Sequence, residues 1–348
     1  MAQMKYFYEL TISSSPHIHS PISTKTIMRD VVIALLPALA AGVYFFGFRA
    51  LLVTLISVAA CVFFEWGYCR LTKTSCKVYD LSAVVTGMLI AFVCPVTIPY
   101  WTIIIGDFFA MIIVKALFGG IGRNIVNPAL AGRAFMMSWA VLMSTWIKVG
   151  FENAAPILGD TSLEALDGMT AATPMSFMHQ GALPNVSLMD AFLGNVGGCI
   201  GETSALALLI GLVYLLVRKV ITLRIPLSFI GTVAVLSFLF PQGGDRLLWT
   251  GYQLCCGGLM LGAIFMATDY VTSPLTKPGQ ILYGIGCGVI TVLIRYFGGY
   301  PEGVSYAILL MNLCVWVFDQ LGQPARFGVT KEMKQAAKLK AKAEKGGQ

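Results

Sequence analysis

The sequence predicts an all-α polytopic membrane protein with about ten transmembrane helices. Charged residues make up only 12% of the 348 residues and hydrophobic residues 57%, whereas a soluble domain has about 25% charged residues. Several segments approach the roughly 20 apolar residues that a helix needs to cross a bilayer. Strands of a membrane barrel would be shorter and would alternate in polarity, so these apolar runs favour helices.

Ten apolar segments are candidate crossing helices. They lie at about residues 28–47, 50–68, 80–97, 100–118, 127–145, 203–222, 226–241, 252–268, 279–297 and 303–320. The third and fourth are joined by "CPVTIPYW", whose two prolines end one helix and start the next. The tenth is the weakest candidate, because Asn312 and Asp319 lie inside or near it.

The distribution of lysine and arginine orients these segments, because both residues are enriched on the cytoplasmic side of membrane proteins. With the N-terminus in the cytoplasm, 20 of the 24 basic residues fall on the cytoplasmic side. The other side receives only Arg49, Lys148, Arg246 and Arg295. We therefore expect both termini in the cytoplasm and one long, acidic extracytoplasmic loop at residues 146–194.

This loop divides the chain into two helical halves. Residues 1–26 are predicted to be a cytoplasmic N-terminal arm, residues 27–145 the first half and residues 195–322 the second half. Residues 323–348 form a basic cytoplasmic tail, which is typical of a segment lying on anionic lipid. We expect no nucleic-acid partner, because the remaining basic residues follow the distribution of a membrane protein.

Five segments in each half would make the halves an inverted repeat. One similarity favours this arrangement: "SAVVTGMLIAFVCP" at 82–95 resembles "GGLMLGAIFMATDYVTSP" at 257–274 in position and composition. We expect the special backbone sites of such halves to meet near the bilayer midplane.

The nine cysteines do not predict a metal site within this chain. They form no CxxC pair, the three histidines do not cluster with them, and most lie in or beside apolar segments, as small buried residues do. The chain also has no dinucleotide-binding fingerprint of a strand, a glycine loop and a helix. No catalytic residue is therefore predicted.

The glycine-rich stretch "GGIGRNIVNPALAGR" is one candidate binding site. Asn124 and Asn127 are three residues apart, so on a helix they would share a face. Their carboxamides could hydrogen-bond the edge of a heterocycle, while Gly119, Gly120 and Gly122 let backbone approach a flat ligand. The alternative is a close contact between helices through small residues.

Two further stretches place polar residues at the membrane boundary. Glu202 in "GCIGETS" lies at an expected helix start, where a carboxylate interacts favourably with the helix dipole. Asp269 and Thr272 in "MATDYVTSPLTKPGQ" follow an apolar run, as in a broken helix end or a re-entrant turn. These three residues either cap backbone or line a flavin site or an ion path, since polar groups are costly in lipid.

The stretch "DGMTAATP" at 167–174 reads, from its residues alone, as a turn in the extracytoplasmic loop. It resembles the flavinylation motif (Asp, small residue, any residue, Ser/Thr, Gly/Ala, Ala, Thr) in the membrane subunits of the Rnf complexes and of the sodium-pumping NADH:quinone reductases. The resemblance implies that Thr173 accepts FMN through a phosphoester bond, within a motif formed by Asp167, Gly168 and Thr170. Ala171 departs from the glycine that is common at its position but is still small.

The resemblance to the RnfD proteins of the Rnf complexes extends from about residue 25 to residue 320. It also rests on "LSAVVTGMLIAFVCP", "GGIGRNIVNPALAGRAF", "GNVGGCIGETSALALLIG", "ATDYVTSPLTKPGQ" and "GGYPEGVSYAILLMN", which occur in the family's order. The N-terminal region before the first segment is shorter than is typical of the related quinone-reductase proteins, which favours Rnf.

Membership in this family implies a redox relay in a bacterial cytoplasmic membrane. The complex passes electrons between ferredoxin and NAD, coupled to movement of Na⁺ or H⁺, and a flavin transferase attaches the FMN outside the membrane. The partners implied are the other Rnf subunits. A second, non-covalent flavin (riboflavin) is also implied, for which we expect Asn124 and Asn127. The competing hypothesis is a channel or secondary transporter with inverted repeats for a small solute.

Overall fold

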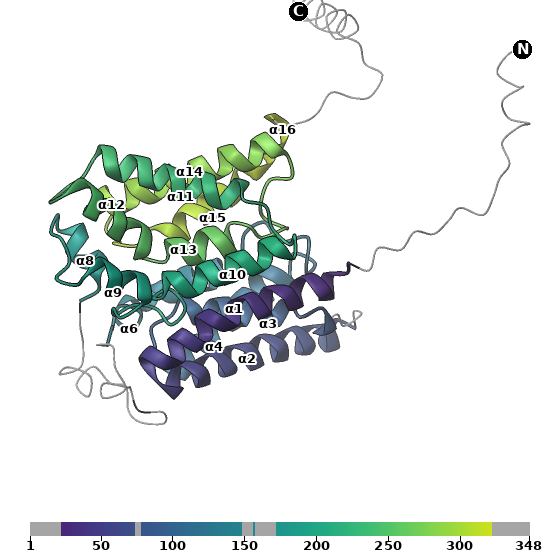
Figure 1. Ribbon diagram of the computed structural model, residues 1–348. Coiled ribbons are helices and arrows are strands. Elements are labelled where there is room, and N and C mark those ends of the chain that lie inside the picture. Colours follow the sequence, from purple (N-terminus) through teal and green to yellow (C-terminus); the bar gives the residue numbers. More distant parts are fainter. Residues whose placement is uncertain (1–21, 74–77, 148–155, 157–171, 322–348) are drawn as a thin grey trace, which may run out of the picture.

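The computed structural model describes residues 22–73, 78–147, 156 and 172–321. The described part of the first half is helical (Figure 1). In chain order it contains α1 (Thr24–Phe46), α2 (Phe48–Thr72), the 3₁₀ turn η1 (Val78–Asp80), α3 (Ser82–Phe92), α4 (Tyr100–Phe108), the π-helix η2 (Phe109–Ala116), α5 (Pro128–Met136), the 3₁₀ turn η3 (Met137–Trp139) and α6 (Ala140–Met143).

The described part of the second half is helical as well. After the short helices α8 (Pro174–His179) and α9 (Leu188–Leu193) it contains α10 (Ala205–Val217), α11 (Arg224–Leu239), α12 (Arg246–Cys255), α13 (Leu259–Leu261), the π-helix η5 (Gly262–Met266), α14 (Lys277–Phe297), α15 (Val304–Leu313) and α16 (Val315–Leu321).

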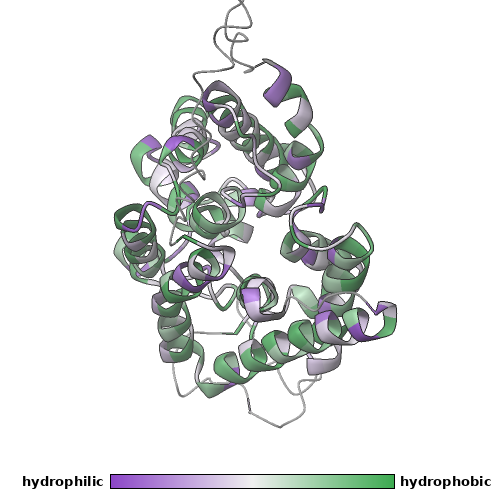
Figure 2. Cartoon of the chain, turned by 90° about the vertical axis from the view of Figure 1, so that its right-hand side faces the viewer, coloured by the Kyte–Doolittle hydropathy of each residue, from purple (hydrophilic) through white to green (hydrophobic). Residues whose placement is uncertain are grey.

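The helices form a multi-pass membrane protein. Within the described residues, α1, α2 and α14 are long and apolar enough to cross a bilayer, with 23, 25 and 21 residues, and the bent pair of α12 with α13–η5 is a fourth candidate. Most turns of the helices contain hydrophobic residues (Figure 2). Large apolar side chains such as Leu55, Ile210 and Leu293 are exposed, which suits lipid because soluble proteins rarely expose large apolar patches.

Each of the ten predicted segments overlaps a helix, but several helices are shorter than predicted. The third segment is helical only over α3, and a non-helical stretch follows to Pro99. The eighth bends by 58° between α12 and α13. Gly257 and Gly258 make this break with left-handed φ angles of 71° and 68°, which glycine adopts without steric cost.

Two buried arginines hold these non-helical stretches. Arg49 on α2 donates to the carbonyl oxygens of Val96 (2.8 Å) and Ile98 (3.3 Å) after α3. Arg295 on α14 donates to carbonyl oxygens at the break after α12, including that of Gly257 (3.1 Å). Both side chains are fully buried. Two of the four basic residues assigned to the extracytoplasmic side are therefore internal and do not face that side.

Figure 1 shows how the two halves are arranged. The helices α1–α4 lie together, α11, α12, α14 and α15 lie together, and α10 packs along α1 between them. α1 begins at the right-hand end of the bundle, where α16 also ends, whereas α6, α8 and α9 lie at the left-hand end.

In α9, hydrogen bonds from Ser187 and Asn195 lower the pKa of the exposed Asp190 carboxyl.

Candidate functional site

Thr173 lies at the N-cap position of α8, at the left-hand end of the bundle in Figure 1. Pro174 starts the helix, which suits a first helical position because proline has no N–H to satisfy there. The Thr173 side chain is 7% exposed and lines a cavity of about 350 Å³ together with residues from three other segments. Asp167, Gly168 and Thr170, the other predicted motif residues, lie outside the described residues.

An ion cluster lies beside this cavity. Arg133 on α5 donates to Glu202 Oε1 (3.1 Å), to Ser305 Oγ (2.9 Å) and to Glu302 Oε2. Glu202 and Glu302 both line the cavity with Thr173. One guanidinium thus bonds two carboxyl groups and joins α5, the segment before α10 and the turn before α15.

The cluster includes a thiol. The Cys199 Sγ lies within 4.8 Å of carboxylate oxygens of both Glu202 and Glu302, a grouping that could hold a metal ion. Arg133 reaches all three groups, and its contact with Cys199 Sγ is 4.0 Å. We therefore interpret the grouping as a charge cluster that is already satisfied by Arg133. The spacing of the cysteines along the chain offers no sign of it.

The residues around Thr173 fit the attachment of a phosphoester. Thr203 lines the same cavity, and its hydroxyl oxygen is buried without a hydrogen-bond partner among the described residues. Gly197, Gly198 and Gly257 also line the cavity, and because they have no side chains they leave space beside Thr173. The described residues line the space around the Thr173 side chain, and part of that space is open to solvent.

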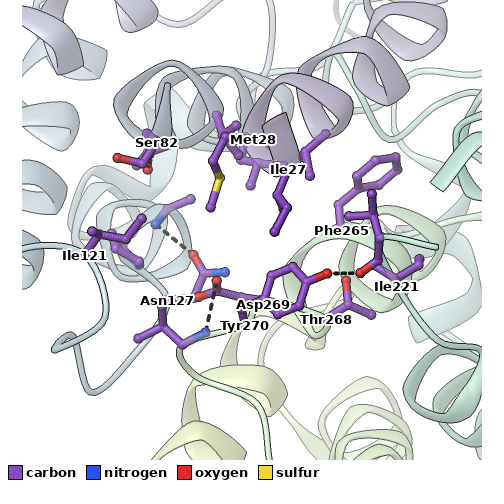
Figure 3. Close-up of a pocket in the computed structure, with 18 of the residues that line it drawn as sticks. Ile27, Met28, Ser82, Ile121, Asn127, Ile221, Phe265, Thr268, Asp269 and Tyr270 are labelled. Atoms are coloured by element: carbon purple, nitrogen blue, oxygen red, sulfur yellow. Dashed lines mark hydrogen bonds between the residues drawn. The ribbon is translucent and has the colours of Figure 1, made fainter. Parts of the chain in front are cut away.

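A second cavity is lined by the start of α1, at the end of the bundle opposite α8 (Figure 1), and Figure 3 shows it in close-up. It encloses about 790 Å³ of space, part of it open, between the start of α1, the start of α3, the end of α10 and the turn after η5. Asn124, Asn127 and Asp269 all line it, and Figure 3 draws Asn127 and Asp269 beside Tyr270. The structure thus brings together three residues from two stretches that are separate in the sequence.

The two asparagines meet in this cavity for a different reason than predicted. The prediction that they share a helix face is wrong, because α5 begins only at Pro128. Asn127 is its N-cap: its Oδ1 accepts from Ala129 N–H (3.0 Å) and its Nδ2 donates to Met266 O (3.2 Å). Asn124 lies in the preceding turn and donates to Val126 O (3.1 Å).

The glycines of this stretch have positive φ angles, 106° at Gly119, 86° at Gly120 and 90° at Gly122. Gly119 and Gly120 line an adjoining cavity of about 800 Å³ and not the asparagine cavity. Lys115 lines both, and its Nζ lies 2.8 Å from Glu65 Oε1 and 2.7 Å from Ser82 Oγ.

Asp269 and Thr272 form the broken helix end that the sequence predicted. Thr272 Oγ1 donates to Asp269 Oδ2 (3.0 Å) in the turn that follows η5. The Asn312 amide joins this turn to α5: in one orientation its nitrogen donates to Thr272 O (3.1 Å) and its oxygen accepts from Asn127 N–H (3.2 Å). In the sequence, Asn312 counted against the tenth segment as a crossing helix. In the structure this side chain connects the turn at Thr272 to Asn127, which lines the cavity.

Glu202 does not lie in the first turn of a helix, so that part of the prediction is wrong. α10 begins at Ala205, and its N-cap is Ser204, whose side chain accepts from Ala207 N–H (3.3 Å). Glu202 lies before the helix and pairs with Arg133. Sequence reasoning missed Arg133 and Glu302. Arg133 is 69 residues from Glu202 and 169 residues from Glu302 along the chain, so no local pattern shows that they meet.

The fold and its two cavities define a class of protein. It is a multi-pass helical membrane protein with a threonine-lined cavity at one end of the bundle and a larger, amide-lined cavity at the other. Such an arrangement can hold one group at each end of the bundle.

The comparisons with known proteins identify the family. Residues 11–328 match the model of the NQR2, RnfD, RnfE family. A relative from Acetobacterium woodii, named as the D component of a Na(+)-translocating ferredoxin:NAD(+) oxidoreductase complex, is 45% identical over 94% of this chain and 98% of its own length. One from Clostridium ljungdahlii, named as the D component of a proton-translocating complex of the same kind, is 41% identical over 91% and 96%.

A third relative, from Stutzerimonas stutzeri, is named as the D component of an ion-translocating oxidoreductase complex and is 36% identical over 88% of this chain and 92% of its own length. The chain belongs to the NQR2, RnfD, RnfE family, as the motifs of the sequence predicted.

Proposed function

We propose that the chain is the membrane component of an ion-translocating ferredoxin:NAD oxidoreductase complex and carries FMN covalently bound to Thr173. The observation that carries this proposal is the cavity lined both by Thr173, which is 7% exposed, and by Thr203, whose hydroxyl has no hydrogen-bond partner among the described residues. Support comes from the family and from the names of its relatives. A bound flavin supplies one- and two-electron redox chemistry.

The chain's own residues then anchor the cofactor and set the charge around it. Thr173 provides the ester oxygen, and Thr203 donates to the phosphate. Arg133 offsets the negative charge of Glu202 and Glu302 beside that phosphate. The predicted motif residues Asp167, Gly168 and Thr170 serve recognition by the flavin transferase in this proposal.

The second cavity is proposed to bind riboflavin non-covalently. Its wall offers a carboxamide, a carboxylate and an ammonium group at Asn124, Asp269 and Lys115, and apolar and aromatic side chains such as Phe265 cover much of the rest. A ring with a polar edge and an apolar face is the chemical class that such a wall recognises. Thr272 supports Asp269 and is assigned to the same site.

The proposed topology has ten crossings, with both termini in the cytoplasm and Thr173 outside. Helices at all ten predicted segments support the number, and the basic tail and N-terminal residues support the orientation. An inverted repeat is supported by an interrupted third segment in each half, which is non-helical after α3 in the first half and bent between α12 and α13 in the second. The partners in this proposal are the lipid bilayer, the other Rnf subunits and the transported Na⁺ or H⁺.

The covalent bond is tested by fluorescence of the denatured protein in a gel under ultraviolet light. The chain is co-expressed with a flavin transferase, and wild type is compared with Thr173→Ala and with Thr250→Ala, a threonine outside the cavity, as the matched control. We expect fluorescence in wild type and in Thr250→Ala, and none in Thr173→Ala. A dark wild-type band beside an active transferase would refute the proposal and favour a channel or secondary transporter.

The non-covalent site has a separate test. Flavin released by denaturing the purified complex is separated from protein and quantified for wild type, Asn124→Ala and Asn195→Ala, the last being an exposed control near α9. We expect loss of released riboflavin only in Asn124→Ala, while the covalent fluorescence is unchanged. Equal riboflavin in all three would exclude the asparagine cavity as its site.

A further inference from the structure

One buried carboxyl group belongs to neither cavity. Asp107 is 0% exposed and lies near the end of α4, just before the π-helix η2. Helix α4 packs there against α2, α3 and α5. The residues that line the cavities described above do not include Asp107.

The hydrogen atoms around Asp107 can be counted. Ser57 Oγ lies 2.8 Å from Asp107 Oδ1 and 2.9 Å from Gly87 O, and all three groups are buried. A serine hydroxyl has one hydrogen to donate. If Asp107 were ionised, one of these two contacts would join oxygen atoms with no hydrogen between them. If Asp107 is protonated, it donates to Ser57, and Ser57 donates to Gly87 O.

The surroundings provide no cation for an ionised Asp107. Within the described residues it has no salt bridge, and its Oδ2 is buried without a hydrogen-bond partner. The titratable groups that face it are thiols, Cys61 from α2 and Cys94 after α3. The ammonium of Lys115 is already paired with Glu65 (2.8 Å). An unpaired buried carboxylate is costly, whereas a neutral acid is not.

We propose that Asp107 is a proton-binding site inside the helix bundle, where it holds a proton as a neutral carboxylic acid. The ligand is a proton and not a metal ion, because a hard cation needs a full shell of oxygen ligands and here one hydroxyl faces one carboxyl group. This site goes beyond the proposed electron relay and does not rest on a flavin at Thr173.

The position of Asp107 gives the bound proton a role. Helix α4, which carries Asp107, packs against α5, which carries Arg133, and continues into η2, which carries Lys115. Asp107 thus lies in the apolar interior on a helix that contacts the elements of both polar clusters, where a proton can be held.

Infrared spectroscopy of the purified full-length chain in lipid tests this proposal. A protonated carboxyl group has a C=O stretching band at higher frequency than ionised carboxylates, and the band moves to lower frequency in D₂O. We expect wild type to show this band at neutral pH and Asp107→Asn to lose it. The matched control is Asp319→Asn, because Asp319 accepts backbone N–H bonds from Leu275 (2.8 Å) and Thr276 (3.3 Å).

A second variant covers the case in which Asp107→Asn fails to fold. Ser57→Ala removes the acceptor of the Asp107 proton, so the band should persist at a shifted frequency. An acid band that Asp107→Asn leaves intact would overturn the proposal. A band at the same frequency in wild type and Ser57→Ala would overturn it as well.

Discussion

Replacing Arg133 with methionine should destabilise the fold more than any other single change in the ion cluster. Arg133 is 7% exposed and bonds two carboxylates and one hydroxyl from three separate segments. Methionine fills similar space but leaves the buried Glu202 and the partly buried Glu302 as neighbouring carboxylates without the guanidinium that bonds both. Removing one side of a buried ion pair costs about 3–5 kcal/mol.

The same cluster predicts a graded series. Glu302→Gln leaves Arg133 paired with Glu202, so only one charge-assisted bond is lost, at about 1.5–3 kcal/mol. Arg133→Lys keeps the charge but not the forked geometry that reaches several acceptors, so its cost should lie between the two. The exposed Arg123 of the same glycine-rich stretch is the control, and Arg123→Met should change stability by less than about 0.5 kcal/mol.

The free energy of unfolding of each purified variant is measured by denaturant titration in detergent micelles, followed by circular dichroism. If Arg133→Met costs no more than Glu302→Gln, the cluster does not join α5 to the segments before α10 and α15, and our reasoning about it is wrong.

Three other substitutions test separate features in the same assay. Gly258→Ala puts a side chain on a left-handed residue, with its Cβ 2.6 Å from Glu202 Cδ, and should cost at least about 1–2 kcal/mol. Gly67→Ala, whose Cβ would meet nothing within 4 Å, should not destabilise. Arg295→Met should cost at least about 2–3 kcal/mol because it leaves buried carbonyl groups unpaired, and a cost no larger than that of the exposed Arg246→Met would refute this. Asn127→Ala removes an N-cap and should cost about 0.5–2 kcal/mol; no loss would mean that the cap contributes little.

The sequence predicted where helices occur better than where they end. Apolar composition located α1, α2 and α14 because each is one continuous helix. It could not reveal the ends of α3 and α12, since hydropathy is the same for a helix and for an extended apolar stretch. Those ends depend on Arg49 and Arg295, which bond the released carbonyl groups from distant helices.

The candidate sites were predictable in part. Asn127 before Pro128 is a recognisable N-cap signal, and Ser204 before the apolar run of α10 is another. Reading both signals would have placed the asparagines and Glu202 outside the helices. The pairing of Glu202 with Arg133 and the meeting of Asn127 with Asp269 arise from tertiary packing, which local spacing does not encode.

The most direct test of the central proposal is mass spectrometry of the peptide that contains Thr173, prepared from the complex purified from its own membrane. We predict that this peptide carries the mass of FMN joined by a phosphoester, with fragment ions that assign the group to Thr173. An unmodified Thr173 peptide from an active complex, or FMN on a different residue, would contradict the proposal.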